Sequence, residues 1–433
     1  MGIELITVIL FGGMVLLLFM GVPAVFAIGG ISVVLTLFLW GTEGLYTIAS
    51  TTFQQITSMS LLAIPMFVLM AHLLVHSGIA DRLYQTLSYW LFGVRGGLAV
   101  VSVGVCTALA MCGGFGPGII TMSVIAIPAM LKRNYDKSLA LGSVMAGGML
   151  GPIIPPSVMM IVFGFITRLS IGKLFIAGII PGFIAAGSFV LYILTRCQLN
   201  PKLAPRVAEE VTWKMRWVSL KGVVLPAALV IGMLGIIFLG IATPTEAAGV
   251  GATGALLCCV INRTISWKIV KVSCLETIKI TGMVIWLLIA ANIFRVFFTS
   301  VGARTLIMGI VAALPVSPWA ILIGMQVILL ILGMFMDDWA IIVICAPIFY
   351  PIAVSLGFDP LWFAMVFLLN MVVAYLTPPF GWALILTKAL SPPGITTRDV
   401  WRAAPPFLGI LILVLIMVML FPQLVLWLPG IMM

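Results

Sequence analysis

The chain has 433 residues, of which 63% are hydrophobic and only 8% are charged, and its formal net charge is +10. Soluble globular proteins carry about 25% charged residues, so this chain lacks the polar surface that would cover a water-soluble core. The basic residues fall in short loops between apolar segments and not on one face of a polar domain, which argues against nucleic-acid binding. The composition indicates an integral membrane protein.

Apolar segments recur along almost the whole chain. In the first half they fall at about 4–20, 22–40, 60–77, 96–112, 117–131, 139–165 and 172–195. After a polar stretch over 196–221 they continue at about 222–241, 245–262, 279–300, 305–315, 319–335, 340–355, 361–387 and 404–428. A run of about 20 apolar residues is the length of a membrane-spanning helix. The sequence therefore predicts an all-α integral membrane fold.

Two segments are too polar to span a membrane, namely 43–58 and 264–276, one in each half of the chain. We expect them to form amphipathic helices that lie in the membrane interface. Such helices would brace a static frame around a moving part, although ordinary surface connectors have the same composition.

One pattern of prolines and aspartates occurs twice, 223 residues apart. Each copy reads Pro, six residues, aromatic-Asp, eighteen residues, Pro-Pro. The copies are Pro128, Tyr135-Asp136 and Pro155-Pro156, and then Pro351, Phe358-Asp359 and Pro378-Pro379. A hydrophobic chain in two halves, each with a proline-interrupted apolar segment, is typical of a secondary transporter built from two repeats.

We therefore predict two inverted-topology repeats with re-entrant hairpins and broken helices, the elevator-type ion-transporter fold. The first repeat is 1–221, with scaffold helices 1–95, a hairpin 96–133, a broken helix 138–165 and a span 172–196. The second repeat is 222–433, with scaffold helices 222–315, a hairpin 319–355, a broken helix 361–388 and a span 404–428.

The two hairpins are inferred from short apolar segments joined by uncharged or helix-breaking tips. Segments 96–112 and 117–131 flank the run Cys112-Gly113-Gly114-Phe115-Gly116-Pro117-Gly118. In the second half, the tip is Met336-Asp337-Asp338-Trp339. Non-helical backbone at membrane depth is tolerated only inside protein or beside a water-filled cavity, so we expect both tips to return inside the membrane.

Each hairpin is followed by an apolar segment with a break, Gly151-Pro152-Ile153-Ile154-Pro155-Pro156 and Thr377-Pro378-Pro379-Phe380-Gly381. Proline lacks an amide donor and clashes with the preceding turn, so adjacent prolines leave carbonyl groups without a helical partner. The simpler interpretation is a kinked helix in which Ser157 or Thr377 replaces the lost bonds. The recurrence of the break behind each hairpin favours a binding role instead.

The orientation follows from the positions of the basic residues. With the two halves threaded in opposite senses, 18 of the 22 Lys and Arg residues fall on one side. That side is predicted to be cytoplasmic, because cytoplasmic loops carry an excess of Lys and Arg. Arg168, Lys173 and Arg304 fall on the other side, Arg295 is intramembrane, and both termini are expected to be periplasmic.

The acids at the second tip are the strongest candidate ion ligands, because an acid at membrane depth is costly and by default functional. A carboxylate together with freed carbonyls would suit sodium. We expect Asp337 near the ion and Asp338 as a cap or hydrogen-bonding partner, although both acids would also suit capping of the next helix. The first tip offers only the carbonyls of Cys112, Gly113 and Gly114, with Ser157 nearby in sequence.

Other charged residues have simpler explanations. Asp136, Asp359 and Glu246 are interpreted as capping acids at helix starts. Arg295 and His72 are expected to reach the membrane surface or to pair with Glu246 or a lipid headgroup, and not to bind substrate. Half-helix amino termini meeting near the membrane midplane favour a carboxylate substrate.

Signatures of other function classes are missing from the sequence. It contains no Walker A motif and no HExxH motif, so ATP hydrolysis, a transition-metal centre and enzymatic activity are not expected.

Five sequence runs carry a family resemblance. They are Gly151–Ser157, Gly333–Asp337, Leu376–Gly381, Thr243–Ala248 and Leu62–Phe67. They resemble the large membrane subunit of TRAP transporters, the tripartite ATP-independent periplasmic systems, over essentially the whole chain.

The resemblance implies a sodium-driven importer of an organic acid, working by an elevator mechanism in a bacterial inner membrane. It implies two partner proteins, a periplasmic substrate-binding protein and a separate small four-helix membrane subunit. Sodium would be the coupling ion, with no organic cofactor. Carried over residue by residue, one sodium site falls at Gly113, Gly114, Gly151 and Ile154, and the other at Asp337, Thr377 and Pro378. The substrate is assigned to Phe115, Pro155, Pro156, Ser157, Asp338, Pro379 and Gly381.

The sequence departs from the family in two places. Cys112-Gly113-Gly114-Phe115 stands where the family often has a Ser-Gly-Ser-Ser tip, so an ion site there would depend on backbone carbonyls. His72 stands where a carboxylate is common. A stand-alone sodium- or proton-coupled elevator symporter for organic anions is the main rival, and a channel or a membrane enzyme is disfavoured by the repeated hairpin and break.

Overall fold

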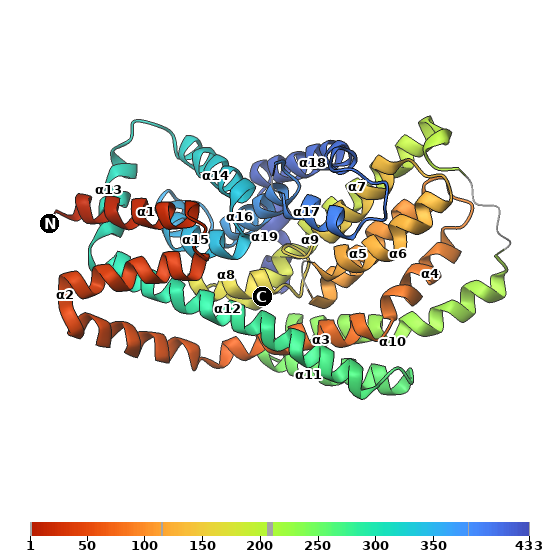
Figure 1. Cartoon of the computed structure of the whole chain (residues 1–433), viewed down its shortest axis with the longest axis horizontal. Helices are drawn as coiled ribbons and strands as arrows, with labels where there is room; N and C mark the ends of the chain where they lie inside the picture. Colours follow the sequence, from red (N-terminus) through yellow and green to blue (C-terminus); the bar gives the residue numbers. More distant parts are fainter. Residues whose placement is uncertain (1, 114–115, 206–210, 380, 433) are drawn as a thin grey trace.

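A computed structural model describes residues 2–113, 116–205, 211–379 and 381–432 (Figure 1). Every regular element in these ranges is helical, which confirms the predicted all-α class. The helices before residue 206 are α1 (Ile3–Phe19), α2 (Ala24–Ile56), η1 (Met59–Leu62), α3 (Ala63–His76), α4 (Ile79–Trp90), α5 (Gly97–Gly113), α6 (Pro117–Lys132), α7 (Lys137–Gly148), α8 (Val158–Thr167), α9 (Ile171–Leu199) and η2 (Pro201–Leu203).

Ten helices follow residue 210 in the described part of the chain. They are α10 (Trp213–Phe238), α11 (Pro244–Ile261), α12 (Trp267–Ser300), α13 (Ala303–Ala313), α14 (Pro318–Phe335), α15 (Asp338–Ser355), α16 (Pro360–Tyr375), α17 (Trp382–Leu390), α18 (Thr397–Leu420) and α19 (Gln423–Met432). Among the described residues, nine helices are long and apolar enough to cross a membrane. Large apolar side chains such as Phe19 and Phe38 are more than 80% exposed, as expected of residues solvated by lipid.

The predicted segments agree with these helices, with two corrections. Segment 43–58 forms a helix of its own, the part of α2 that follows a kink at Gly41, whose φ of 62° suits glycine; its place in the membrane interface stays a prediction. Segment 264–276 enters α12 at residue 267 and continues without interruption into the span. Segment 404–428 is divided into α18 and α19 at Pro422, because proline cannot continue the hydrogen-bond ladder.

Both predicted breaks are present. The first separates α7 from α8 over residues 149–157, and the second separates α16 from α17 over residues 376–381. The apolar arms that flank each tip pack against each other, α5 against α6 and α14 against α15. α14 and α15 each have 18 residues and also satisfy the length and hydropathy of a full span.

The helix contacts are paired in a regular way. α6 packs against α17, and α15 packs against α8. Adding 223 to the residue numbers of α6 gives nearly the range of α15, and subtracting 223 from those of α17 gives nearly the range of α8. The two contacts are therefore equivalent under this offset. The contacts of α5 with α7 and α14 with α16 exchange in the same way, as do those of α3 with α11 and α2 with α12. α6 is therefore held by the helix that follows the second break, and α15 by the helix that follows the first.

α9 lies directly on the first break. A Cβ atom added to Gly178 would overlap the carbonyl oxygen of Ile153 and the Met160 side chain, and one added to Gly182 would lie 2.5 Å from Cγ1 of Ile154. Only a residue without a side chain permits so close an approach between a helix and irregular backbone. The break is thus enclosed, and Ile153 and Ile154 are fully buried.

Candidate functional site

The first break is built around one serine. Ser157 is buried, its hydroxyl donates to the carbonyl oxygen of Pro152 at 3.1 Å, and its oxygen accepts from the amide of Met160 at 3.4 Å. The first bond connects the two ends of the break, and the second caps the start of α8. This is the local repair that the simpler interpretation of the break anticipates, and it uses the Ser157 donor and one of its two acceptor positions.

Several carbonyl groups of this break accept no hydrogen bond from a described residue, and two of them belong to predicted sodium ligands. Among the described residues, the carbonyl oxygens of Gly151 and Ile154 accept no hydrogen bond, although both residues are buried. Buried carbonyl groups are nearly always paired, and an unpaired one costs about 1–3 kcal/mol. Two unpaired oxygens three residues apart are therefore well suited to ligate a small hard cation.

At the second break, a tyrosine and an aspartate are paired across two elements. The hydroxyl of Tyr375, the last residue of α16, donates to a carboxylate oxygen of Asp338, the first residue of α15. Asp338 is only 3% exposed. The prediction that Asp338 is a hydrogen-bonding partner is confirmed, and its partner, Tyr375, is a residue that sequence reasoning missed. Thr377 donates to the carbonyl of Val373 at 2.8 Å, as a repaired kink requires.

Asp337 differs from its neighbour. It occupies the N-cap position of α15, yet its side chain accepts no capping hydrogen bond, and it is exposed. Its carboxyl group lies close enough to that of Asp338 to interact with it electrostatically. Among the described residues neither acid forms an ion pair. The exposed Asp337 carboxylate, with no positive partner among the described residues, leaves negative charge at this tip.

The remaining predicted site residues lie at the same two breaks. Pro155 and Pro156 are buried between α7 and α8, while Pro378 and Pro379 are partly exposed between α16 and α17. Gly381 is buried against the Tyr375 and Thr377 carbonyls. Gly113 is the last residue of α5. The predictions for Gly114 and Phe115 fall outside the described residues, so the first tip itself is not placed.

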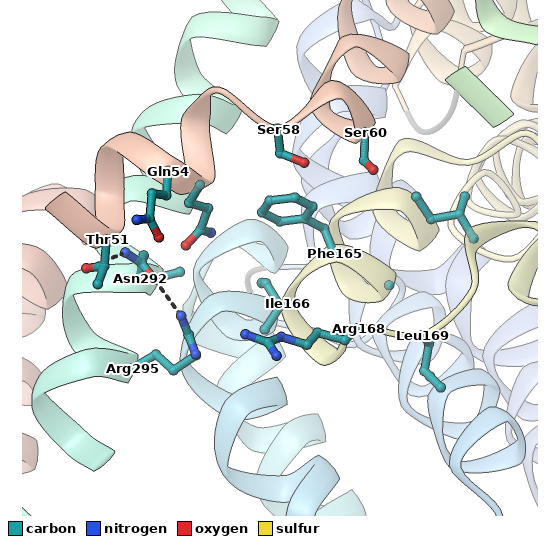
Figure 2. A pocket seen from close by; sticks show the side chains of 14 residues that line it. Thr51, Gln54, Ser58, Ser60, Phe165, Ile166, Arg168, Leu169, Asn292 and Arg295 are labelled. Atoms are coloured by element: carbon teal, nitrogen blue, oxygen red, sulfur yellow. Dashed lines mark hydrogen bonds between the residues drawn. The ribbon is translucent and has the colours of Figure 1, made fainter. Parts of the chain in front are cut away.

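A polar cavity of about 500 Å³ lies at the far end of α8 from the break (Figure 2). Its walls come from the end of α2 with η1, from α12, and from the end of α8 with the turn that follows it. Its polar lining consists of Thr51, Gln54, Gln55, Ser58, Ser60, Arg168, Asn292 and Arg295. Of the residues that the structure describes, no acid and none of those predicted from sequence to bind substrate line it.

Asn292 organises one wall of this cavity. Its amide nitrogen lies 3.3 Å from the Thr52 hydroxyl and 3.5 Å from the Thr51 hydroxyl, and its carbonyl oxygen accepts from Nη2 of Arg295 at 2.7 Å. Asn292 therefore ties α2 to α12 and orients the Arg295 guanidinium, as Figure 2 shows. The interpretation that Arg295 pairs with Glu246 is wrong, because Glu246 bonds the amide and hydroxyl of Thr243.

The predicted capping acids are confirmed. Asp136 accepts from the amide of Leu139, and Asp359 accepts from the amides of Leu361 and Trp362. Glu246 forms a reciprocal capping box with Thr243 at the start of α11. These acids stabilise helix starts and lie outside the candidate site.

The sequence and fold both have known relatives. Residues 11–424 match the family described as "Tripartite ATP-independent periplasmic transporter, DctM component". The chain is 35% identical to the C4-dicarboxylate TRAP transporter large permease protein DctM of Pseudomonas aeruginosa over 93% of both chains. It is 30% identical to the isethionate TRAP transporter permease protein DctMQ of Oleidesulfovibrio alaskensis, covering 98% of this chain and 66% of that relative.

Among solved structures, the fold is similar to the YdaH transporter of Alcanivorax borkumensis, with a TM-score of 0.61 and 14% identity over 95% of this chain and 98% of that one. This likeness concerns the fold alone. The match over nearly the full length, with a permease relative above 30% identity, settles the family. The chain belongs to the DctM component of the TRAP transporters, their large multi-pass membrane permease subunit.

Proposed function

We propose that this chain imports a small organic carboxylate across a bacterial inner membrane, driven by sodium, with the substrate delivered by a periplasmic binding protein. The observation that carries the sodium coupling is the set of unpaired oxygens at the two breaks. Among the described residues, the carbonyls of Gly151 and Ile154 lack donors, and the carboxylate of Asp337 lacks a positive partner. Sodium requires such oxygen ligands and supplies the positive charge that the Asp337 carboxylate lacks.

The reciprocal packing of the hairpins supports an elevator mechanism. Because α6 packs against α17 and α15 against α8, the hairpin arms and broken helices of both halves form one connected body. Such a body would move as a unit against α2, α3, α11 and α12, which pack against one another. In this proposal, both ions and the substrate travel with the moving body.

The substrate class follows from the relatives. The Pseudomonas aeruginosa relative is named for C4-dicarboxylates, and others are named for sialic acid and ectoine. We propose a C4-dicarboxylate because the relative named for C4-dicarboxylates shares 35% of its residues with this chain, against 30% for the one named for isethionate and 28% for those two others. Succinate is therefore the first compound to test. The small membrane subunit is expected as a permanent partner.

Uptake by reconstituted vesicles tests this proposal. The chain and its small subunit are placed in proteoliposomes, and labelled succinate uptake is followed with and without an inward sodium gradient and with and without the binding protein. We expect uptake only when both are present. Uptake by the chain alone would favour the stand-alone symporter, and uptake driven equally well by a proton gradient would contradict sodium coupling.

A further inference from the structure

The cavity at the end of α8 has no role in the site described above. It is separated from the break by the length of α8, 10 residues or about 15 Å. Its volume of about 500 Å³ lies within the usual range for small-molecule sites. The cavity is therefore large enough to hold a ligand of its own.

The charged side chains that the structure describes in the cavity lining are all positive. Arg168 and Arg295 reach into it from opposite walls, from the end of α8 and from α12 (Figure 2). No acid in the described ranges lines it, and Arg168 makes no hydrogen bond or ion pair with a described residue. Two guanidinium groups close enough to repel each other are stabilised by an anion placed between them.

The neutral lining suits a carboxylate in particular. The side chains of Gln54, Gln55, Ser58 and Ser60 form no hydrogen bond with a described residue, so their amide and hydroxyl donors are available. A guanidinium group binds a carboxylate through two parallel bonds, and Asn292 holds Arg295 in one orientation for such a contact.

We propose that this cavity is a second binding site for the carboxylate substrate, occupied before the substrate reaches the breaks. This proposal rests on the proposed function. Charge-based threading places Arg168 on the side opposite the basic loops, the side from which an imported anion arrives. The site is composed of residues from α2 and α12 on one side and α8 on the other, so movement of α8 against α2 and α12 dismantles it and releases the anion.

The test uses charged thiol reagents on Ser60→Cys, a change at an exposed lining residue. The complex is reconstituted in purely zwitterionic lipid, with no sodium gradient and no binding protein. Labelling by an anionic and by a cationic methanethiosulfonate is compared, after subtraction of labelling in the protein without this cysteine. We expect the ratio of the anionic to the cationic labelling rate to be higher for this cysteine than for a free thiol.

Charge removal then identifies the source of that preference. Arg168→Gln and Arg295→Gln should each lower the anionic-to-cationic rate ratio about tenfold, the effect of one unit charge at roughly 6 Å in water on two oppositely charged reagents. Arg304→Gln is the matched control, because Arg304 is an exposed arginine of α13 that does not line the cavity. Succinate should slow labelling, and its neutral diamide should not.

Three results would overturn the proposal. They are a rate ratio that the arginine substitutions leave unchanged, a lack of protection by succinate, and protection by added anionic lipid in place of succinate, which would assign the cavity to a lipid phosphate. Since the measurement uses neither a sodium gradient nor the binding protein, failure of the sodium-coupled function leaves it unaffected. Equally, sodium-driven uptake with an unreactive cavity would refute this site alone.

Discussion

At the scale of single residues, adjacent acids have separate roles. Asp338 is buried and accepts a hydrogen bond from the hydroxyl of Tyr375, so it needs no ion as a partner. Asp337 is exposed, caps nothing and has no positive partner among the described residues. A negative group that stabilises neither the helix start nor an ion pair is the one that an incoming cation would neutralise.

Asp337→Ala should therefore weaken the coupling while leaving the protein folded. We expect the sodium concentration for half-maximal uptake to rise at least about tenfold, equivalent to the loss of roughly 1.4 kcal/mol of ion binding, with little change in thermal stability. Glu43→Ala is the control, since Glu43 is an exposed acid far along the chain in α2. An unchanged sodium dependence would remove Asp337 from the ion site.

At the scale of elements, the irregular backbone is supported by close helix packing. α9 approaches the first break because Gly178 and Gly182 present no side chain toward Ile153 and Ile154. The same helix carries Gly187, where an added Cβ meets nothing within 4 Å. One helix thus offers a position where a methyl group must displace the break and another where it is harmless.

Gly178→Ala should lower the thermal stability of the purified chain by an amount corresponding to about 1–3 kcal/mol, the usual cost of overpacking a filled core. Gly187→Ala should be neutral or slightly stabilising, because alanine favours a helix more than glycine does, by up to about 1 kcal/mol. Equal melting temperatures for the two variants would show that α9 does not constrain the break.

Much of this element-level arrangement was predictable from sequence. Hydrophobic runs located the helices, and Pro-Pro with a preceding aspartate located the breaks and their capped starts, because these signals are local. The pairing of Tyr375 with Asp338 was not predictable, since the two residues are 37 positions apart. A binding role for Arg295 was not predictable for a similar reason. The sequence shows where Arg295 lies along its helix, but the cavity that it shares with Arg168 forms only when α8 and α12 are brought together in the fold.

At the scale of the whole molecule, two groups of helices meet at the cavity. Gln54 lies on α2 and Ile166 on α8, and both line it. If α8 belongs to a body that moves against α2 and α12, a covalent cross-link between α2 and α8 across the cavity should stop transport.

Gln54→Cys with Ile166→Cys tests this movement. A flexible reagent with two methanethiosulfonate groups should abolish succinate uptake, and reduction should restore it. Either single cysteine, treated in the same way, should retain uptake. Full activity of the cross-linked double variant would contradict an elevator in which these helices separate.

The central claim is that sodium crosses the membrane together with the carboxylate. The most direct measurement is the influx of radioactive sodium into proteoliposomes that hold the chain and its small subunit. We predict that sodium influx rises when binding protein loaded with succinate is added, in fixed proportion to succinate uptake, and that it stays at the background level with unloaded binding protein. Succinate uptake without any accompanying sodium influx would contradict the account.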